Sequence, residues 1–352
     1  MAMVIDNHVH VISGTPGNEY EGPLFRWNRA MLWAYGPGQK PPYERDPMVI
    51  FPRQEERVAD PDGSATVAAM DKAGVDACVL IHADFGICYG SESPKGMEEM
   101  HQDHVDIANR FPGRFHPFAG PDVRRPGSLE MVTKGLQDGR FKGQKIMPQV
   151  GYFASDRILW PFYKANLEAG TPVAICTTFE LPPTYGRFND PIHIADVVAD
   201  FPDLSVIIFH CGTAFEHWYE VSLAIARTAL NTYMEFDGWI HPGRHPEEEM
   251  IRRLARARDT VGAHRITFGT DGQFSHSNYG ERRTEDYVRH VAFWKELPQR
   301  AKKYGISFSQ EEIDLMMGLN LARLLKIVDM PEYEKKYKFG WAIRTPGPRL
   351  SP

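Results

Sequence analysis

The sequence predicts an α/β fold, a (β/α)8 (TIM) barrel, and two observations lead to this prediction. Short apolar runs alternate along the chain with amphipathic stretches of helical spacing, and this order is typical of parallel strands joined by helical crossovers. Eight such runs can be counted, and no Gly-x-Gly-x-x-Gly motif follows an early strand. The absence of that motif disfavours an open, doubly wound sheet, which is the alternative.

The expected strands are short and apolar, as strands buried on both faces should be. Their carboxyl ends should form one mouth of the barrel, where folds of this class carry their active sites. In chain order the strands are expected at residues 2–11, 75–82, 114–120, 141–147, 171–177, 204–210, 232–237 and 265–271.

The expected helices fall between these strands, and local signals mark three of their ends. Gly170 suits a C-terminal stop, Asn189-Asp190-Pro191 combines a capping residue with a first-turn proline, and Ser309-Gln310-Glu311-Glu312 forms a capping box. The helices are expected at residues 64–74, 97–111, 156–169, from 189 onward, 215–230, 246–258, 284–303 and 310–326.

Two segments do not fit the repeat. Residues 12–63 are rich in proline, glycine and aromatic residues, and we expect an insertion loop that forms a lid over the mouth, an oligomer contact or a surface loop. Residues 331–352 are basic, aromatic and rich in proline, and should wrap the barrel or a neighbouring subunit. The expected organisation is therefore one barrel domain, residues 1–330, and a C-terminal extension.

Composition limits the function classes. A net charge of -6 without a basic cluster argues against nucleic acid, and no apolar run reaches the roughly 18 residues of a membrane span. No signal peptide is apparent. The four cysteines form no Cys-x-x-Cys pair, which favours a reducing cytoplasm. We therefore expect a cytoplasmic protein that acts on a small molecule.

Polar residues gather at the expected strand ends. His8 and His10 are two residues apart on the first strand, so both imidazoles lie on one face. His210 and Asp271 end the sixth and eighth strands and should reach the same mouth. Neutral imidazoles and a carboxylate bind zinc, manganese or iron and can leave a coordination position open. Such an ion activates water or polarises a substrate oxygen.

At this point a family resemblance is evident. The chain resembles the amidohydrolase superfamily, and in particular the amidohydrolase-related branch that includes aminocarboxymuconate-semialdehyde decarboxylase and the resorcylate-type decarboxylases. The matching segments run in the family's order from residue 4 to about 327, and are Ile5-Asp6-Asn7-His8-Val9-His10, residues 70–76, Gly143-Gln144-Lys145-Ile146, residues 170–173, Phe209-His210-Cys211-Gly212, Phe268-Gly269-Thr270-Asp271 and residues 318–324.

The resemblance implies that His8, His10 and Asp271 bind one catalytic divalent ion, with zinc expected first and manganese or iron as alternatives. Asp271 would also shuttle a proton, and His210 would contact the bound water, the substrate or the ion itself. The family further implies a homodimer or a larger homo-oligomer.

One position departs from the family pattern. The fifth strand usually ends in Pro-Val-x-x-His, but here Pro172 and Val173 lead to Cys176. A thiolate can bind zinc or iron, so Cys176 could replace the histidine as a ligand. If Cys176 is instead a buried apolar residue, either His210 coordinates the ion directly or the metal is weak or lost.

The remaining candidates would contact the substrate. The resemblance implies that Lys145, on the fourth strand, binds a substrate carboxylate; the alternative, as in two-metal relatives, is a carboxylated lysine that bridges two ions. His82, at the end of the second strand, and His217, near the sixth helix, either face the pocket or pack structurally. Trp27 belongs to the expected lid. Glu235 and Asp237 end the seventh strand, where they would contact substrate or cap the next helix.

Three functions remain open at this point. The first is hydrolysis of a C–N or ester-like bond of a small aromatic or cyclic substrate by metal-activated water, with Asp271 and His210 as catalytic residues. The second is non-oxidative decarboxylation of an aromatic or unsaturated acid, against which the missing histidine on the fifth strand counts modestly. The third is a non-catalytic barrel that binds a ligand.

Overall fold

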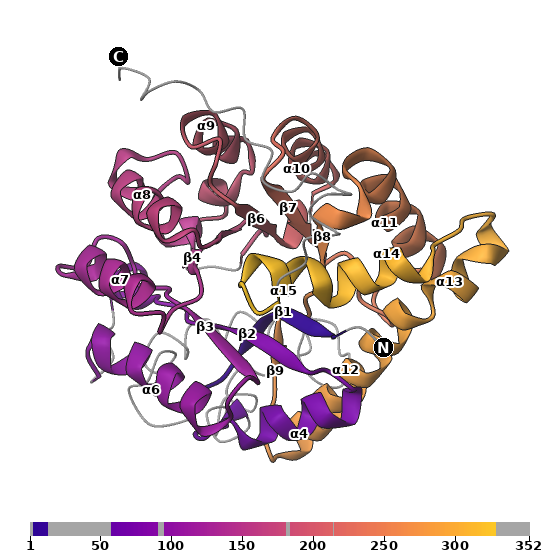
Figure 1. Cartoon of the computed structure of the whole chain (residues 1–352), viewed down its shortest axis with the longest axis horizontal. Coiled ribbons are helices and arrows are strands. Elements are labelled where there is room, and N and C mark those ends of the chain that lie inside the picture. Colours follow the sequence, from indigo (N-terminus) through magenta and orange to yellow (C-terminus); the bar gives the residue numbers. More distant parts are fainter. Residues whose placement is uncertain (1–2, 13–57, 91–94, 181–183, 214, 329–352) are drawn as a thin grey trace, which may run out of the picture.

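The computed structural model describes residues 3–12, 58–90, 95–180, 184–213 and 215–328. Trp27, most of the expected lid and the expected C-terminal extension lie outside these residues. In Figure 1 the helices surround a central ring of strands.

All eight expected strands are present, each within its predicted range. A further short strand, β9, follows β8 and pairs with β1 through Val9 and Gly272. The strands are β1 (Ile5–His10), β2 (Ala77–Ile81), β3 (Phe115–Phe118), β4 (Gln144–Ile146), β5 (Val173–Cys176), β6 (Val206–Phe209), β7 (Thr232–Glu235), β8 (Ile266–Thr267) and β9 (Gly272–Gln273).

The strands form a closed parallel barrel. Four of them pair in the order β3-β2-β1-β9 and five in the order β4-β5-β6-β7-β8. A bridge between Ala119 and Gln144 joins the two groups at one seam. At the other seam the Asn7 amide donates to the Phe268 carbonyl at 2.9 Å. The predicted (β/α)8 architecture is thereby confirmed, and all strand ends that carry candidate residues meet at one mouth.

Most of the expected helices surround the ring, whereas the last helical segment, residues 310–324, crosses the ring in the view of Figure 1. Gly170 ends α8 with a φ of 63°, and the Ser309–Glu312 capping box opens α14, so both end signals are confirmed. The helices are α4 (Ser64–Ala73), α5 (Gly86–Tyr89), α6 (Met97–Arg110), α7 (Ser128–Gln137), α8 (Trp160–Ala169), α9 (Ile192–Asp200), α10 (Glu216–Thr228), α11 (Glu247–Val261), α12 (Asn278–Lys295), α13 (Leu297–Arg300), α14 (Gln310–Asp314) and α15 (Asn320–Leu324).

Three of these helices differ from expectation. Helix α7 was not predicted; it contains Gly135, whose missing side chain makes room for the ring of Phe141. Helix α12 begins at Asn278 rather than residue 284 because the Ser277 hydroxyl accepts the Gly280 amide. The predicted helix over 310–326 is interrupted by a π-helical turn, Leu315–Leu319.

The π-helical turn lies against the start of β1. A Cβ on Gly318 would come within 1.8 Å of the Met3 carbonyl oxygen, so only glycine permits this approach. Just after the turn, Leu321 and Ala322 on α15 belong to the cluster of buried side chains formed with Ile5, Val79 and Ile207 from the strands. The end of the barrel opposite the mouth is therefore filled by apolar packing.

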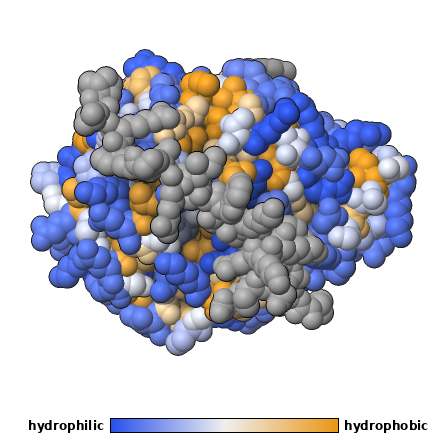
Figure 2. Space-filling model, turned by 45° about the horizontal axis from the view of Figure 1, so that its top comes forward, coloured by the Kyte–Doolittle hydropathy of each residue, from blue (hydrophilic) through white to orange (hydrophobic). Residues whose placement is uncertain are grey.

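Figure 2 shows the distribution of hydrophilic and hydrophobic residues on one face of the molecule. On the face drawn in Figure 2, hydrophilic residues cover most of the described surface, with smaller hydrophobic areas between them. Within the described part of the chain, no helix combines the length and the apolar character that crossing a membrane would require.

Candidate metal centre

Three donor atoms converge where β1 ends. The Nε2 atoms of His8 and His10 lie 3.2 Å apart, and Asp271 Oδ1 lies 3.5 Å from the first and 3.2 Å from the second. Ligands bound to one ion at about 2.0–2.2 Å are separated by about 3.0–3.5 Å. The spacing of these three atoms therefore fits a shared divalent ion, and the side chains predicted to bind it are brought together.

The backbone after β8 turns Asp271 toward the two histidines. Asp271 has a φ of 51°, in the left-handed region that non-glycine residues seldom occupy. The preceding Thr270 donates its amide at 3.1 Å and its hydroxyl at 2.6 Å to buried Asp6, and Asp6 also accepts the His8 amide at 3.0 Å. One carboxyl group thus fixes the Asp271 loop to the strand of the histidines.

The protonation states of these groups suit metal binding. Burial and the nearby Lys145 ammonium hold the pKa of His8 well below its usual value, so the imidazole is neutral. Burial opposes charge on Asp271, but the contact with His10 and the charge of His210 favour the carboxylate, and the pKa of Asp271 lies well below its usual range. A neutral imidazole beside an ionised carboxylate is the combination a metal requires.

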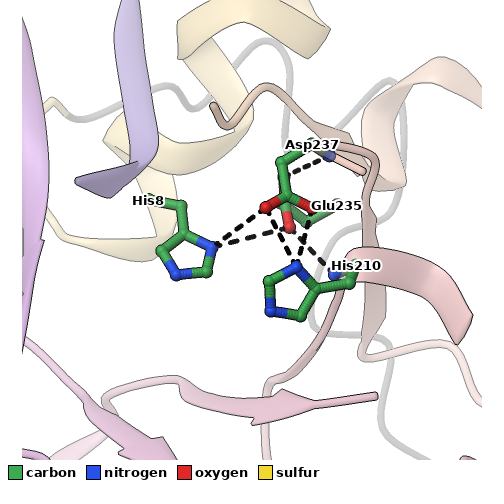
Figure 3. A group of neighbouring side chains, drawn as sticks. All are labelled: His8, His210, Glu235 and Asp237. Carbon is green, nitrogen blue, oxygen red and sulfur yellow. Dashed lines mark hydrogen bonds and ion pairs between the residues drawn. The ribbon is translucent and has the colours of Figure 1, made fainter. Parts of the chain in front are cut away.

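The second nitrogen of His8 faces carboxyl groups at the end of β7. His8 Nδ1 lies 3.6 Å from Asp237 Oδ2 and 3.9 Å from Glu235 Oε2 (Figure 3). Carboxylates in this position favour the tautomer with the proton on Nδ1 and the lone pair on Nε2. The Nε2 atom of His8 is therefore presented to the three-donor group.

His210 is held by the same two acids. Its Nδ1 donates to Asp237 at 2.8 Å, and its amide donates to Glu235 at 3.0 Å. Burial lowers the pKa of His210, but Asp237 and the neighbouring Cys176 outweigh burial and raise it well above its usual value. Burial and Asp237 likewise raise the pKa of the Glu235 carboxyl well above its usual range. Glu235 and Asp237 both contact His210. From the sequence, these two residues were expected to contact substrate or to cap the next helix.

Cys176 belongs to a separate group of donors. Its sulfur, a Glu180 oxygen and a His210 nitrogen all lie within 4.8 Å of one another, whereas His8, His10 and Asp271 form their own group. Cys176 is buried at the end of β5. It therefore lies at the mouth, where a cysteine that replaces the usual histidine ligand would have to lie. Glu180 was not predicted from the sequence. The feature that could have indicated it is its position four residues after the end of β5.

Lys145 extends from β4 into the same region. Its Nζ lies 3.4 Å from His8 Nε2 and 4.1 Å from the centre of the Phe209 ring. Among the described residues, no carboxylate lies within 4.0 Å of this buried ammonium group. A cation without an anionic partner beside the donor atoms is suited to bind an anionic group of a substrate.

The other candidates for substrate contact lie apart from the donor atoms. His82 is buried with its ring 4.0 Å from that of His101 and 5.4 Å from that of His104. His217 is exposed on the first turn of α10, 5.5 Å from the Phe215 ring. Neither belongs to the donor groups of the described residues, so their contact with substrate remains a prediction.

Comparison with known proteins identifies a family that the chain matches. Residues 5–327 match the model of a family described as amidohydrolase. A comparison with curated proteins gives no match.

Several solved structures share the fold. An uncharacterized TIM-barrel protein from Bordetella bronchiseptica is similar with a TM-score of 0.61 and 18% identity, over 92% of this chain and 98% of that one. A 5-carboxyvanillate decarboxylase from Novosphingobium aromaticivorans, complexed with manganese, has a TM-score of 0.60 and 15% identity, over 92% and 96% of the two chains. A 2,6-dihydroxybenzoate decarboxylase from Rhizobium has a TM-score of 0.56 and 15% identity, over 93% and 99%.

The family match covers the chain from the first barrel strand to the last barrel helix, and it includes His8, His10, His210 and Asp271. The chain therefore belongs to the amidohydrolase family.

Proposed function

We propose that this chain is a metal-dependent carboxy-lyase that removes the carboxyl group of a small aromatic acid without oxidation. The observation that carries the proposal is the buried Lys145 ammonium, which lies 3.4 Å from a donor atom of the metal centre and has no carboxylate partner among the described residues. Similar structures include decarboxylases of hydroxylated benzoic acids. Of the two reactions expected from the sequence, these observations favour decarboxylation over hydrolysis.

The donor set fits the required ion. Two imidazole nitrogens and one carboxylate oxygen suit manganese or zinc, and manganese is present in one of the similar decarboxylases. A divalent ion held by His8, His10 and Asp271 would supply Lewis-acid polarisation of substrate oxygens. The assay described below, with added zinc or manganese, distinguishes zinc, the ion expected first, from manganese.

The chain's own residues supply the remaining requirements. Lys145 binds and orients the substrate carboxylate, as its position beside His8 allows. In the reaction the bond between the ring carbon and the carboxyl carbon breaks, carbon dioxide leaves, and the ring carbon takes up a proton. His210 holds a proton at neutral pH because Asp237 raises its pKa, so His210 is the proton donor that we assign.

The test is a product assay on small hydroxylated benzoic acids, run in parallel with amides and esters of the same acids. We expect release of carbon dioxide and the decarboxylated phenol, dependent on added manganese or zinc. Hydrolysis of the amides or esters without carbon dioxide release would overturn the proposal in favour of the hydrolase.

A matched pair of variants tests the role of Lys145. Lys145→Met should raise KM for the acid by about tenfold or more, because a charged contact to the carboxylate is lost. Lys142→Met, three residues earlier and ahead of β4, should leave KM unchanged. Equal effects of the two substitutions would contradict the assignment of Lys145.

A further inference from the structure

A second set of ligand atoms lies beside the proposed metal centre. Cys176 at the end of β5, Glu180 beyond it and His210 at the end of β6 each offer one donor, and these donors lie within 4.8 Å of one another. Ligands around one tetrahedral ion at about 2.0–2.3 Å lie about 3.3–3.8 Å apart, so the three donors would reach a common ion after side-chain rotations that bring them closer together. His8, His10 and Asp271 form a different group.

The orientation of His210 supports this arrangement. Its Nδ1 is already engaged by Asp237 at 2.8 Å, and Figure 3 shows Nε2 on the opposite side of the ring, turned away from Asp237. Nε2 is thus the nitrogen that remains for Cys176 and Glu180. A carboxylate that holds the other nitrogen of a histidine is the usual support for a metal ligand.

A polar side chain contacts the Cys176 sulfur. The side-chain amide of Asn189 lies 3.7 Å from the sulfur, and its second contact, to the Thr178 carbonyl at 2.6 Å, fixes that amide in place. The Cys176 sulfur therefore has a fixed polar neighbour at the end of β5.

Acidic groups outnumber cations around this set. Glu180, Glu235 and Asp237 all lie close to His210. Lys145 is the nearby lysine, and it lies against His8 and the Phe209 ring rather than against a carboxylate. An additional cation would balance the charge that these groups carry when ionised.

We propose that Cys176, Glu180 and His210 form a second ion-binding site, selective for a thiophilic divalent ion such as zinc, cobalt or cadmium. Binding releases the protons of the thiol and of His210 Nε2. Thiolate ligands select soft or borderline ions over manganese and magnesium. An ion at this site also takes the nitrogen from which the proposed reaction draws its proton, so the doubly loaded protein should be inhibited.

Cobalt binding to the full chain, after removal of endogenous metal, tests the second site. We expect two cobalt ions per chain and the near-ultraviolet absorption of a thiolate–cobalt bond. Cys176→Ser should bind one ion and lose this absorption, whereas Cys88→Ser, which alters a cysteine on α5, should match the wild type. Glu180→Gln should retain the absorption but bind the second ion about tenfold or more weakly.

The outcomes that overturn the second site are equally distinct. One cobalt ion per chain with a thiolate absorption that Cys176→Ser abolishes would place Cys176 in the first centre and eliminate a second one. Absorption that survives Cys176→Ser would exclude the thiolate altogether. Both readouts are made without substrate, so they stand or fall separately from carbon dioxide release.

Discussion

His8 is constrained on both sides of its imidazole ring. Its Nδ1 faces Asp237 at 3.6 Å and its Nε2 lies 3.2 Å from His10, while the ring stacks on Phe209 with centroids 4.4 Å apart. Each contact restricts the ring to one orientation. A ligand held in this way loses little freedom when it binds an ion, which strengthens binding.

Removing His10 tests the three-donor group at the level of single residues. We expect His10→Ala to lose at least about tenfold in metal affinity, since one of three protein ligands is missing. Metal content of the purified protein, followed by competition with a chelator, measures the effect. His217→Ala, on the exposed start of α10, should retain the metal, and equal losses in both variants would contradict the assignment.

The sequence predicts some of these residues and not others, for a physical reason. His8 and His10 are predictable because the two-residue period of a strand fixes their common face. The partnership of His210 with Asp237 was not predicted, because placing side chains at one mouth does not specify which of them pair. Glu180 lies in a loop whose path no periodicity specifies. Backbone turns with positive φ at His210 and Asp271 likewise leave no mark in the sequence pattern.

An ion pair between buried Asp84 and partly buried Arg125 joins the loops after β2 and β3. Asp84 accepts two hydrogen bonds from Arg125, at 2.5 and 2.8 Å, and a third from the Asp122 amide at 2.9 Å. Burial alone would raise the pKa of Asp84, but Arg125 outweighs it and holds that pKa below its usual value.

The depressed pKa of Asp84 makes this contact sensitive to acid. The free energy of unfolding should contain its full contribution above about pH 5 and lose it as the pH falls below about 4 toward the folded pKa, since the unfolded carboxyl titrates near 3.9. We expect Asp84→Asn to cost about 1–3 kcal/mol at pH 7 and progressively less in acid.

Urea unfolding at several pH values measures the difference between Asp84→Asn and the wild type. Asp138→Asn is the control, because Asp138 and its partner Arg140 are both substantially exposed and should contribute about 0.5 kcal/mol or less. A cost of Asp84→Asn that stays constant down to pH 3 would contradict the pKa argument.

The π-helical turn provides a second prediction for an element. A Cβ on Gly318 would lie 1.8 Å from the Met3 carbonyl oxygen, and the backbone that precedes β1 cannot move without shifting that strand. Gly318→Ala should therefore lower the free energy of unfolding by about 1–3 kcal/mol, although alanine is ordinarily the better helix former. Chemical denaturation measures this change.

Gly96→Ala is the comparison for Gly318→Ala. No heavy atom lies within 4 Å of a Cβ on Gly96, so the substitution only changes the residue that caps α6, at a cost of about 1 kcal/mol or less. If Gly318→Ala were no more destabilising than Gly96→Ala, the close approach of the turn to β1 would be refuted. The helix predicted at 310–326 is confirmed over residues 310–324, but its π-helical turn was not predicted, because this contact depends on Met3, far away in sequence.

For the whole molecule, the alternation of strands and helices is sufficient to predict the barrel. All eight strands lie within their expected ranges because each is a compact apolar run bounded by turn residues. Helix α7 was missed because Gly135, a residue unfavourable in helices, fits only once Phe141 packs over it. Closure of the ring by β9 and by the bond from Asn7 to Phe268 depends on tertiary packing and has no counterpart in the local pattern.

The proposed metal centre takes its ligands from the first strand and from the segment after the eighth, and this leads to a prediction for global stability. His8 and His10 lie on the first strand, while Asp271 follows the eighth, so the three donors meet only when the barrel is closed. An ion that binds the folded state alone adds about 2.7 kcal/mol at a free concentration of 100 times its Kd. Removing it with a chelator should therefore lower the Tm of the wild type by several degrees.

His10→Ala separates this effect from a general action of the chelator. With manganese, which the proposed thiolate site disfavours, the variant should respond much less to chelator than the wild type does, and added manganese should raise the Tm of the wild type far more than that of the variant. Thermal unfolding followed by circular dichroism gives both values. A wild-type Tm that does not respond to chelator or added ion would mean that His8, His10 and Asp271 hold no ion in the folded chain, because any ligand bound only by the folded state must shift unfolding.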